Sequence, residues 1–210
     1  MTKYLPEGHL INTIENKSAI KSVFALQEAM LHGQILEARA KICDGDHNLI
    51  IDLPCIKGII PRIEGAIGIE DGSTRDIALI SKVNKPVCFK VLNITTDENG
   101  EPVAILSRKA VQLECMREYI ETLNAGDIIP AKVTHLEQFG CFVDIACGIP
   151  SLIPIDAISI SRISHPSDRF STGQNIFVII KSIENGRICL SHKELLGTWE
   201  ENAEKFNVGE

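Results

Sequence analysis

Two phenylalanines, Phe139 and Phe142, flank a glycine within the stretch Gln138-Phe-Gly-Cys-Phe-Val-Asp144. If this stretch is a β-strand, Cys141 and Val143 face one side and Phe142 faces the other. The core-facing set is then complete without Phe142, so its ring is left for the surface. Exposed aromatic rings are what base stacking requires, because every base offers a π face. The two rings therefore predict a stacking platform for nucleic-acid bases.

The chain around the two rings has the pattern of a small β-barrel. Five stretches of residues 126–193 show strand character, with alternating apolar residues or short apolar runs between glycine and asparagine turns. They are Gly126–Thr134, Gln138–Ile145, Ser151–Ile155, Ile176–Ile180 and Arg187–Ser191. Five short strands in a segment of this length are typical of a closed or partly closed barrel.

The motifs GDIIPAKV, FGCFVD, SLIPI, GQ and GRICLSHK follow one another along residues 126–193. In order and spacing they resemble the RNA-binding repeat of ribosomal protein S-one, an OB-fold barrel. The resemblance implies an RNA face made of two aromatics, a histidine, an acid and an arginine. Carried over, the aromatics are Phe139 and Phe142 and the arginine is Arg187. The histidine position holds Pro154 and the acid position holds Ile183, so two polar contacts are missing.

Three more cations are candidates for RNA contacts. Lys132 lies on the outward side of the first strand, where it meets a phosphate or remains solvated. Arg162 and Arg169 lie on the connection before the fourth strand. In the alternative reading, Asp168 simply pairs with an arginine there. Ser164 is placed to cap a short helix that begins near Pro166.

Residues 33–109 repeat the same series of landmarks imperfectly. With Asp52 aligned on Asp144, the positions of Phe139 and Phe142 hold His47 and Ile50, and that of Arg187 holds Val103. This copy keeps the barrel pattern without the stacking face, which favours a structural or docking module.

Two helices are expected outside the barrels. One spans Ser18–Leu31 with Ile20, Val23, Phe24, Ala25, Leu26, Met30 and Leu31 facing the core, and the other spans Lys109–Leu123. The domain plan is an N-terminal helical segment (1–32), a degenerate first barrel (33–109), a linker helix (110–125), a second RNA-binding barrel (126–193) and a linker toward a missing third repeat (194–210). The predicted fold class is mainly β, with two OB-fold-like five-stranded barrels joined by a helix.

Composition narrows the function further. The 210 residues are 44% hydrophobic and carry a net charge of −7, yet residues 126–193 contain as many basic as acidic residues. A neutral barrel gains little from phosphate attraction, so stacking must carry a larger share of the affinity.

The seven cysteines form no CxxC pair and are expected to be buried free thiols. Apolar runs are too short for a membrane span and the N-terminus lacks a signal core, which indicates a cytoplasmic protein.

The sequence contains no phosphate-binding loop, GxSxG or HExxH motif. It therefore predicts a protein that is not an enzyme and that needs no metal or cofactor. The leading hypothesis is binding of single-stranded messenger RNA in translation, with the small ribosomal subunit as a further partner. The alternative is a protein-docking scaffold whose rings are buried against other proteins without direct RNA contact.

Overall fold

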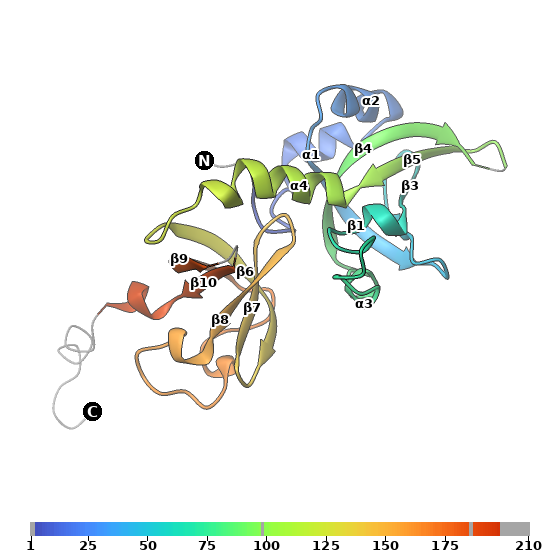
Figure 1. Ribbon diagram of the computed structural model, residues 1–210. Coiled ribbons are helices and arrows are strands. Elements are labelled where there is room, and N and C mark those ends of the chain that lie inside the picture. Colours follow the sequence, from blue (N-terminus) through green and yellow to red (C-terminus); the bar gives the residue numbers. More distant parts are fainter. Residues whose placement is uncertain (1–2, 98, 185–186, 198–210) are drawn as a thin grey trace. The chain divides into compact units, whose positions relative to one another are not determined.

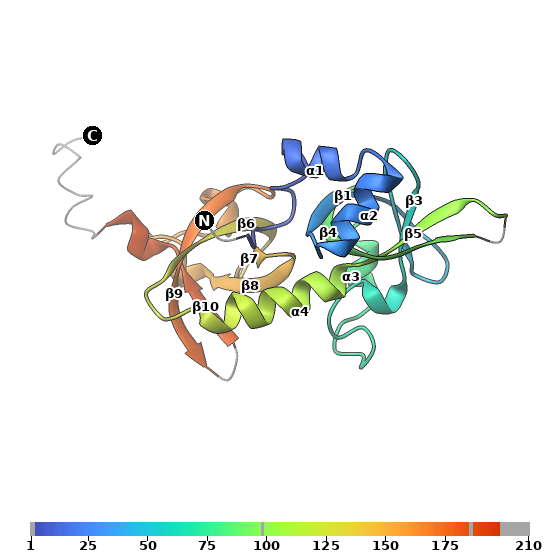
Figure 2. The same ribbon diagram turned by 90° about the horizontal axis from the view of Figure 1, so that it is seen from above.

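The structure is a computed structural model that describes residues 3–97, 99–184 and 187–197. The chain divides into two compact units at residue 121, and each is described by itself. Figure 1 and the view turned by 90° in Figure 2 show a small β-barrel in each unit. The fold class predicted from the sequence, mainly β with two five-stranded OB-like barrels, is confirmed.

The barrel of the first unit closes in the order β1-β2-β3-β5-β4. Its strands are β1 (Leu36–Cys43), β2 (Leu49–Ile51), β3 (Lys57–Ile60), β4 (Pro86–Thr96) and β5 (Pro102–Ser107). The pairing of β3 with β5 is parallel and the other pairings are antiparallel. In β1, Ala38 and Ala40 are buried while Arg39 and Lys41 are exposed, so the alternation predicted by the sequence sets the inner and outer faces.

Helix α2 (Val23–Leu31) covers most of the expected helix, and a separate helix α1 (Ile14–Ala19) precedes it and ends within the expected range. The prediction of a continuous helix over Ser18–Leu31 was therefore wrong. The Ser22 hydroxyl accepts a hydrogen bond from the Ala25 amide, which starts α2 as a new helix. The predicted core face was also partly wrong, because Phe24 and Leu31 are exposed.

The remaining helical segments of the first unit are short. They are η1 (Arg62–Glu64), α3 (Ile77–Ile80) and α4 (Arg108–Glu118). Helix α4 begins after Ser107, whose hydroxyl accepts from the Ala110 amide, and it ends before Tyr119. The predicted linker helix is thus shorter than expected, and the 3-10 turn η2 (Ile120–Thr122) follows it.

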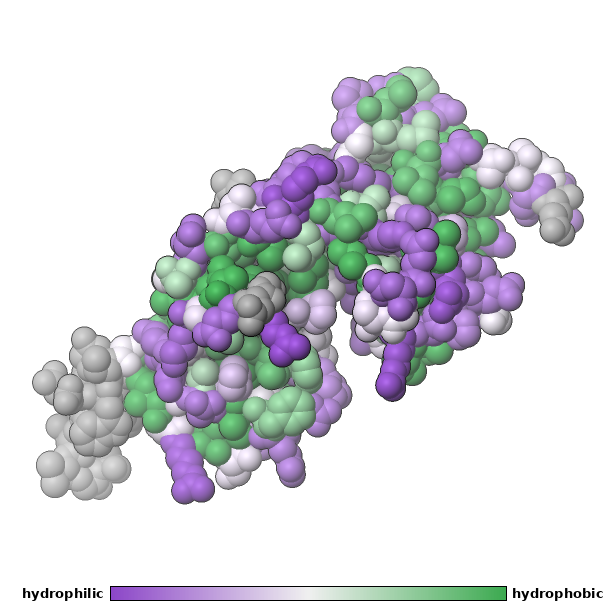
Figure 3. All heavy atoms as spheres, in the orientation of Figure 1, coloured by the Kyte–Doolittle hydropathy of each residue, from purple (hydrophilic) through white to green (hydrophobic). Residues whose placement is uncertain are grey.

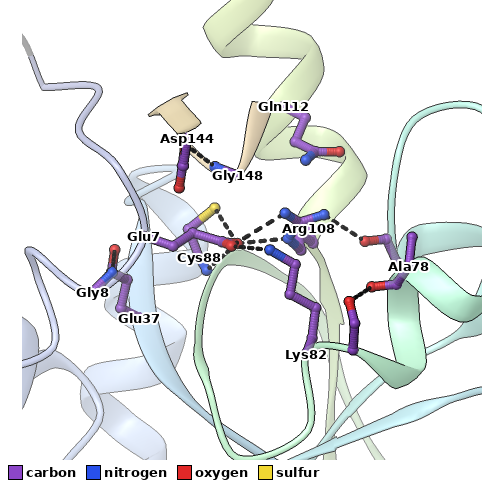
Figure 4. Close-up of polar contacts among 12 residues, drawn as sticks. Glu7, Gly8, Glu37, Ala78, Lys82, Cys88, Arg108, Gln112, Asp144 and Gly148 are labelled. Carbon is purple, nitrogen blue, oxygen red and sulfur yellow. Dashed lines mark hydrogen bonds and ion pairs between the residues drawn. The ribbon is translucent and has the colours of Figure 1, made fainter. Parts of the chain in front are cut away.

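A buried ionic cluster ties the N-terminal segment to the first barrel (Figure 4). The Glu7 carboxylate lies 2.6 Å from Arg108 Nε and 2.7 Å from Lys82 Nζ, and it accepts from the Cys88 amide. Burial opposes ionisation of Glu7, but the two cations hold its pKa below the ordinary value. A second buried carboxylate holds the same N-terminal segment: Glu37 accepts hydrogen bonds from the amides of Gly8, Leu10 and Ile11.

The barrel of the second unit has the same topology, in the order β10-β8-β7-β6-β9. Its strands are β6 (Ile128–Glu137), β7 (Gly140–Ala146), β8 (Ile149–Pro154), β9 (Asn175–Glu184) and β10 (Arg187–Ser191), with the 3-10 turns η3 (Ile155–Ala157), η4 (Pro166–Asp168) and η5 (Lys193–Leu196). Aliphatic side chains from all five strands fill the barrel, among them Val133, Val143, Ile153, Val178 and Leu190. Their burial fixes which side chains point outward.

Among the described residues, no helix is long and apolar enough to cross a membrane. The expected linker toward a third repeat falls mostly on residues 198–210, which lie outside the described residues.

Candidate nucleic-acid interface

Phe142 lies on the outer face of β7, as the alternation predicted. Its neighbours Cys141 and Val143 are fully buried, and Phe142 itself is half-buried. Phe139 lies in the turn before β7 and is 57% exposed. The two ring centroids are 6.0 Å apart and the ring planes are perpendicular. The structure therefore brings both predicted aromatics together, in the edge-to-face arrangement that aromatic pairs favour.

Gly140 allows the backbone of β7 to approach β8 closely. It pairs with Pro154, and a Cβ atom at Gly140 would lie 2.4 Å from the carbonyl oxygen of Ile153. The Phe139 carbonyl accepts a hydrogen bond from the Ile155 amide at 3.0 Å, which fixes the backbone under the exposed ring. Glycine is therefore needed at position 140 for the close approach of two strands.

His135 is a third ring on this face, and sequence reasoning missed it. The β6–β7 ladder has a bulge between Val133 and His135, so Thr134 and His135 are both exposed. His135 pairs directly with Phe142, their ring centroids are 6.5 Å apart, and His135 Nε2 lies 2.7 Å from a Glu137 carboxylate oxygen. Two consecutive polar residues in an alternating strand were the available signal for this bulge.

Two of the three rings, those of His135 and Phe142, belong to a row of outward positions that crosses the barrel. Successive strand partners are His135, Phe142, Leu152, Cys189 and Ser182. Leu152 is half-buried and Cys189 is exposed. All seven cysteines are free, as expected, but the prediction that they are buried was only partly right. Cys43 and Cys55 are half-buried, and Cys189 is exposed because its strand position points outward from the barrel.

Lys132 and Arg187 lie one row away from Phe142. Lys132 pairs with Asp144, and Asp144 pairs with Pro150, which is two residues before Leu152 in β8. Because β8 and β10 are parallel, Arg187 lies beside Pro150, two residues before Cys189. Arg187 is exposed and Lys132 is half-buried. Both predicted cations are thus on the outer face next to the rings.

Arg162 and Arg169 are exposed on the connection between β8 and β9, outside the rows of strand residues. The structure does not bring them together with Phe142 by strand pairing. One prediction and one alternative interpretation for this connection were wrong. His165, not Ser164, caps the short turn at Pro166, and the Asp168 carboxylate accepts from the amides of Ser164 and His165 instead of pairing with an arginine. Asp168 closes the capping box, which uses the carboxylate locally.

Two further observations limit the chemistry of this unit. Burial raises the pKa of the Cys141 thiol to about 11, so the thiol beneath the rings stays protonated and inert. Among the described residues, no group of three or more His, Cys, Asp or Glu could hold a metal ion.

A five-stranded barrel with this strand order is an OB fold, a class in which the face of the second and third strands and the adjoining loops bind oligonucleotides or oligosaccharides. Residues 122–193 match the model of the S1 (S-one) RNA binding domain. The resemblance expected from the sequence is therefore confirmed.

The similarity to known proteins extends over most of the chain. The small ribosomal subunit protein bS1 of Staphylococcus aureus (strain COL) is 34% identical over 190 residues, which cover 87% of this chain and 45% of that protein. The bS1 protein of Staphylococcus saprophyticus is 33% identical over 199 residues, which cover 90% of this chain and 47% of that protein. The chain thus spans about half the length of these relatives.

Among solved structures, the solution structure of GSP13 from Bacillus subtilis is similar with a TM-score of 0.34 and 19% identity, covering 41% of this chain and 74% of that chain. A multidomain protein with nucleic acid binding domains from Streptococcus pneumoniae gives a TM-score of 0.30 at 14% identity, covering 76% of this chain and 51% of that chain. At these TM-scores the similarity adds nothing to what the strand order shows.

Proposed function

We propose that the second barrel binds single-stranded RNA by stacking bases on Phe139, Phe142 and His135. The observation that carries this proposal is the grouping of three rings on one outer face, where the core does not use them. Base stacking on aromatic side chains contributes about 1–3 kcal/mol per base and tolerates any base. The match of residues 122–193 to the model of the S1 RNA binding domain supports the same assignment.

Lys132 and Arg187 contact the phosphates that flank the stacked bases, because they lie one row from Phe142. Arg162 and Arg169 extend the positive charge along the connection before β9. Since residues 126–193 contain equal numbers of basic and acidic residues, we expect a shallow dependence of affinity on salt. Stacking then contributes more to affinity than counterion release does.

For the protein as a whole we propose a cytoplasmic role in translation, in which it holds messenger RNA at the small ribosomal subunit. The similarity to bS1 proteins over most of the chain supports this role. In this proposal the chain is a binding module and not an enzyme. The docking-scaffold alternative is less favoured, because the match of residues 122–193 to the S1 RNA binding domain model supports RNA as the ligand of this barrel.

Fluorescence-anisotropy titration of labelled single-stranded RNA at low and moderate salt tests the proposal. The Phe139→Ala/Phe142→Ala double variant should lose most of the affinity while it still unfolds in a cooperative thermal transition, at a lower temperature than the wild type. Phe177→Ala is the matched control, because Phe177 is an equally exposed phenylalanine on β9, paired with Pro130 and outside the row of Phe142. Absence of RNA binding by the wild type at low salt, or equal losses in the control, would refute the proposal.

A further inference from the structure

The outer face of the first barrel can be compared with the ring-bearing face of the second, position by position. In both barrels the first strand has a bulge at the same place, between Ala40 and Ile42 and between Val133 and His135. From that bulge one row of strand partners crosses each barrel. In the first barrel the row is Ile42, Ile50, Ile59, Ile105 and Asn93, and in the second it is His135, Phe142, Leu152, Cys189 and Ser182.

The first barrel thus carries four isoleucines where the second carries histidine, phenylalanine, leucine and cysteine. A second bulge adds Leu92, at the position that Lys181 occupies in the second barrel. We call these five side chains, Ile42, Ile50, Ile59, Ile105 and Leu92, the aliphatic stripe. Ile42 is 53% exposed and Leu92 is 47% exposed, while the other three are half-buried. Figure 3 shows apolar surface on this unit beside the β4–β5 hairpin.

An aliphatic row of this kind cannot stack bases, and it leaves apolar surface in water. Exposed isoleucines scattered singly are ordinary, but adjacent ones on neighbouring strands form one patch, which marks an interaction surface. Each Å² of apolar surface removed from water contributes about 25 cal/mol to association. The stripe therefore favours a partner with matching aliphatic side chains.

The two edges of the stripe carry opposite charge. On one edge lie Lys41 and Lys57 with Asp52 beside Lys41 at 3.9 Å, and all three side chains are exposed. On the other edge, the β1–β2 turn that follows Ile42 carries Asp44 and Asp46. One edge is therefore net positive and the other is net negative.

These edges make the stripe complementary to itself. When two copies of the face pack about a twofold axis that runs along the stripe, the isoleucines meet and the positive edge of each copy faces the negative edge of the other. Isologous contacts of this kind generate closed dimers. We infer that the aliphatic stripe of the first barrel is a dimerisation surface and that its occupant is the same stripe of a second copy of this chain.

The stripe is small beside a standard protein interface, so the dimer should be weak and concentration-dependent. Sedimentation velocity of the full chain from about 1 to about 200 μM, a range that brackets micromolar affinity, should show a shift from monomer to dimer. Ile42→Glu should lower the association constant about tenfold or more, since it buries a charge in an apolar contact. Lys57→Glu should lower the association constant less than Ile42→Glu does. Added salt should reduce the difference between Lys57→Glu and the wild type.

Phe24→Glu is the matched control, because Phe24 is an exposed apolar residue of the same unit that lies on α2 and not in the row of strand residues that forms the stripe. It should leave the association constant unchanged. If Ile42→Glu proves to be unfolded by circular dichroism, Ile42→Thr keeps the β-branched shape and should still weaken the dimer. A wild type that stays monomeric over the whole range would overturn the inference. A dimer that neither the Ile42 variant nor Lys57→Glu weakens would overturn it too. So would a dimer that Phe24→Glu also dissociates.

Discussion

His135 and Phe142 are direct partners across the β6–β7 ladder, and their ring centroids lie 6.5 Å apart with the planes tilted by 33°. The pair exists because a bulge turns His135 outward. Glu137, two residues further along β6, holds the imidazole through Nε2 at 2.7 Å. The imidazole is thus oriented before any ligand arrives, which lowers the entropy lost on binding.

His135→Ala should weaken single-stranded RNA binding about 5-fold to 150-fold, because one stacking surface worth about 1–3 kcal/mol is lost. His135→Phe should restore most of the affinity, since it returns a ring without the imidazole nitrogens. Anisotropy titrations with the same RNA measure both. Equal losses in the two variants would show that the ring is not the contributing feature.

Phe139 and Phe142 should differ in their effect on stability. Phe139 is largely exposed, so Phe139→Ala should change the free energy of unfolding by less than about 0.5 kcal/mol. Phe142 is half-buried between its strand neighbours, and Phe142→Ala should cost about 1–2 kcal/mol. Thermal or urea unfolding measures these values, and the reverse order would contradict the placement of the two rings.

Gly140→Ala should destabilise the second barrel by about 1–3 kcal/mol, because the added methyl meets a backbone carbonyl that cannot move without breaking the β7–β8 ladder. Gly45→Ala is a suitable control, since a Cβ there has no heavy atom within 4 Å. Urea denaturation of the two variants provides the comparison. Near-equal stabilities would mean that the strands do not approach as closely as described.

Arg187→Ala should weaken RNA binding and reduce the slope of log affinity against log salt by about 0.7, the value for one phosphate contact on a single strand. Arg162→Ala tests the connection before β9 in the same way. The structure places only Arg187 beside the row of rings, so we expect the larger change for Arg187. Titrations at several salt concentrations give both slopes, and a larger change for Arg162 would move the RNA path toward the connection.

Glu37 should make the first unit less stable as the pH rises from about 4.5 to about 7. Burial raises the pKa of this carboxyl from 4.5 to about 7. Between these values the folded state keeps a proton that the unfolded state has lost, so the free energy of unfolding falls by up to about 3 kcal/mol.

Glu37→Gln mimics the neutral carboxyl and should remove this part of the pH dependence. Urea denaturation of wild type and variant at several pH values isolates the contribution of Glu37 as the difference between the two profiles. Parallel profiles would show that Glu37 does not titrate in this range.

The parts of the site that follow from strict alternation could be predicted from the sequence. Burial of Cys141 and Val143 required Phe142 to face outward, and the landmark order was sufficient to identify the barrel. His135 was missed by strict alternation, because a single extra residue at a bulge reverses the face of every residue beyond it. Likewise, a break between two helices at Ser22 depends on one side-chain cap, which an apolar pattern alone does not show.

The shared register of the two barrels also bears on how repeated domains diverge. Inward positions stay aliphatic in both copies, because packing in a closed barrel tolerates few changes of volume. Outward positions carry no such constraint, and a handful of substitutions along one row, with the backbone bulge retained, exchanges a ring-bearing face for an aliphatic one. The outer face of a duplicated barrel can therefore change while every intermediate variant still folds. Protein engineering can use the same substitutions in reverse, to place rings on the aliphatic face.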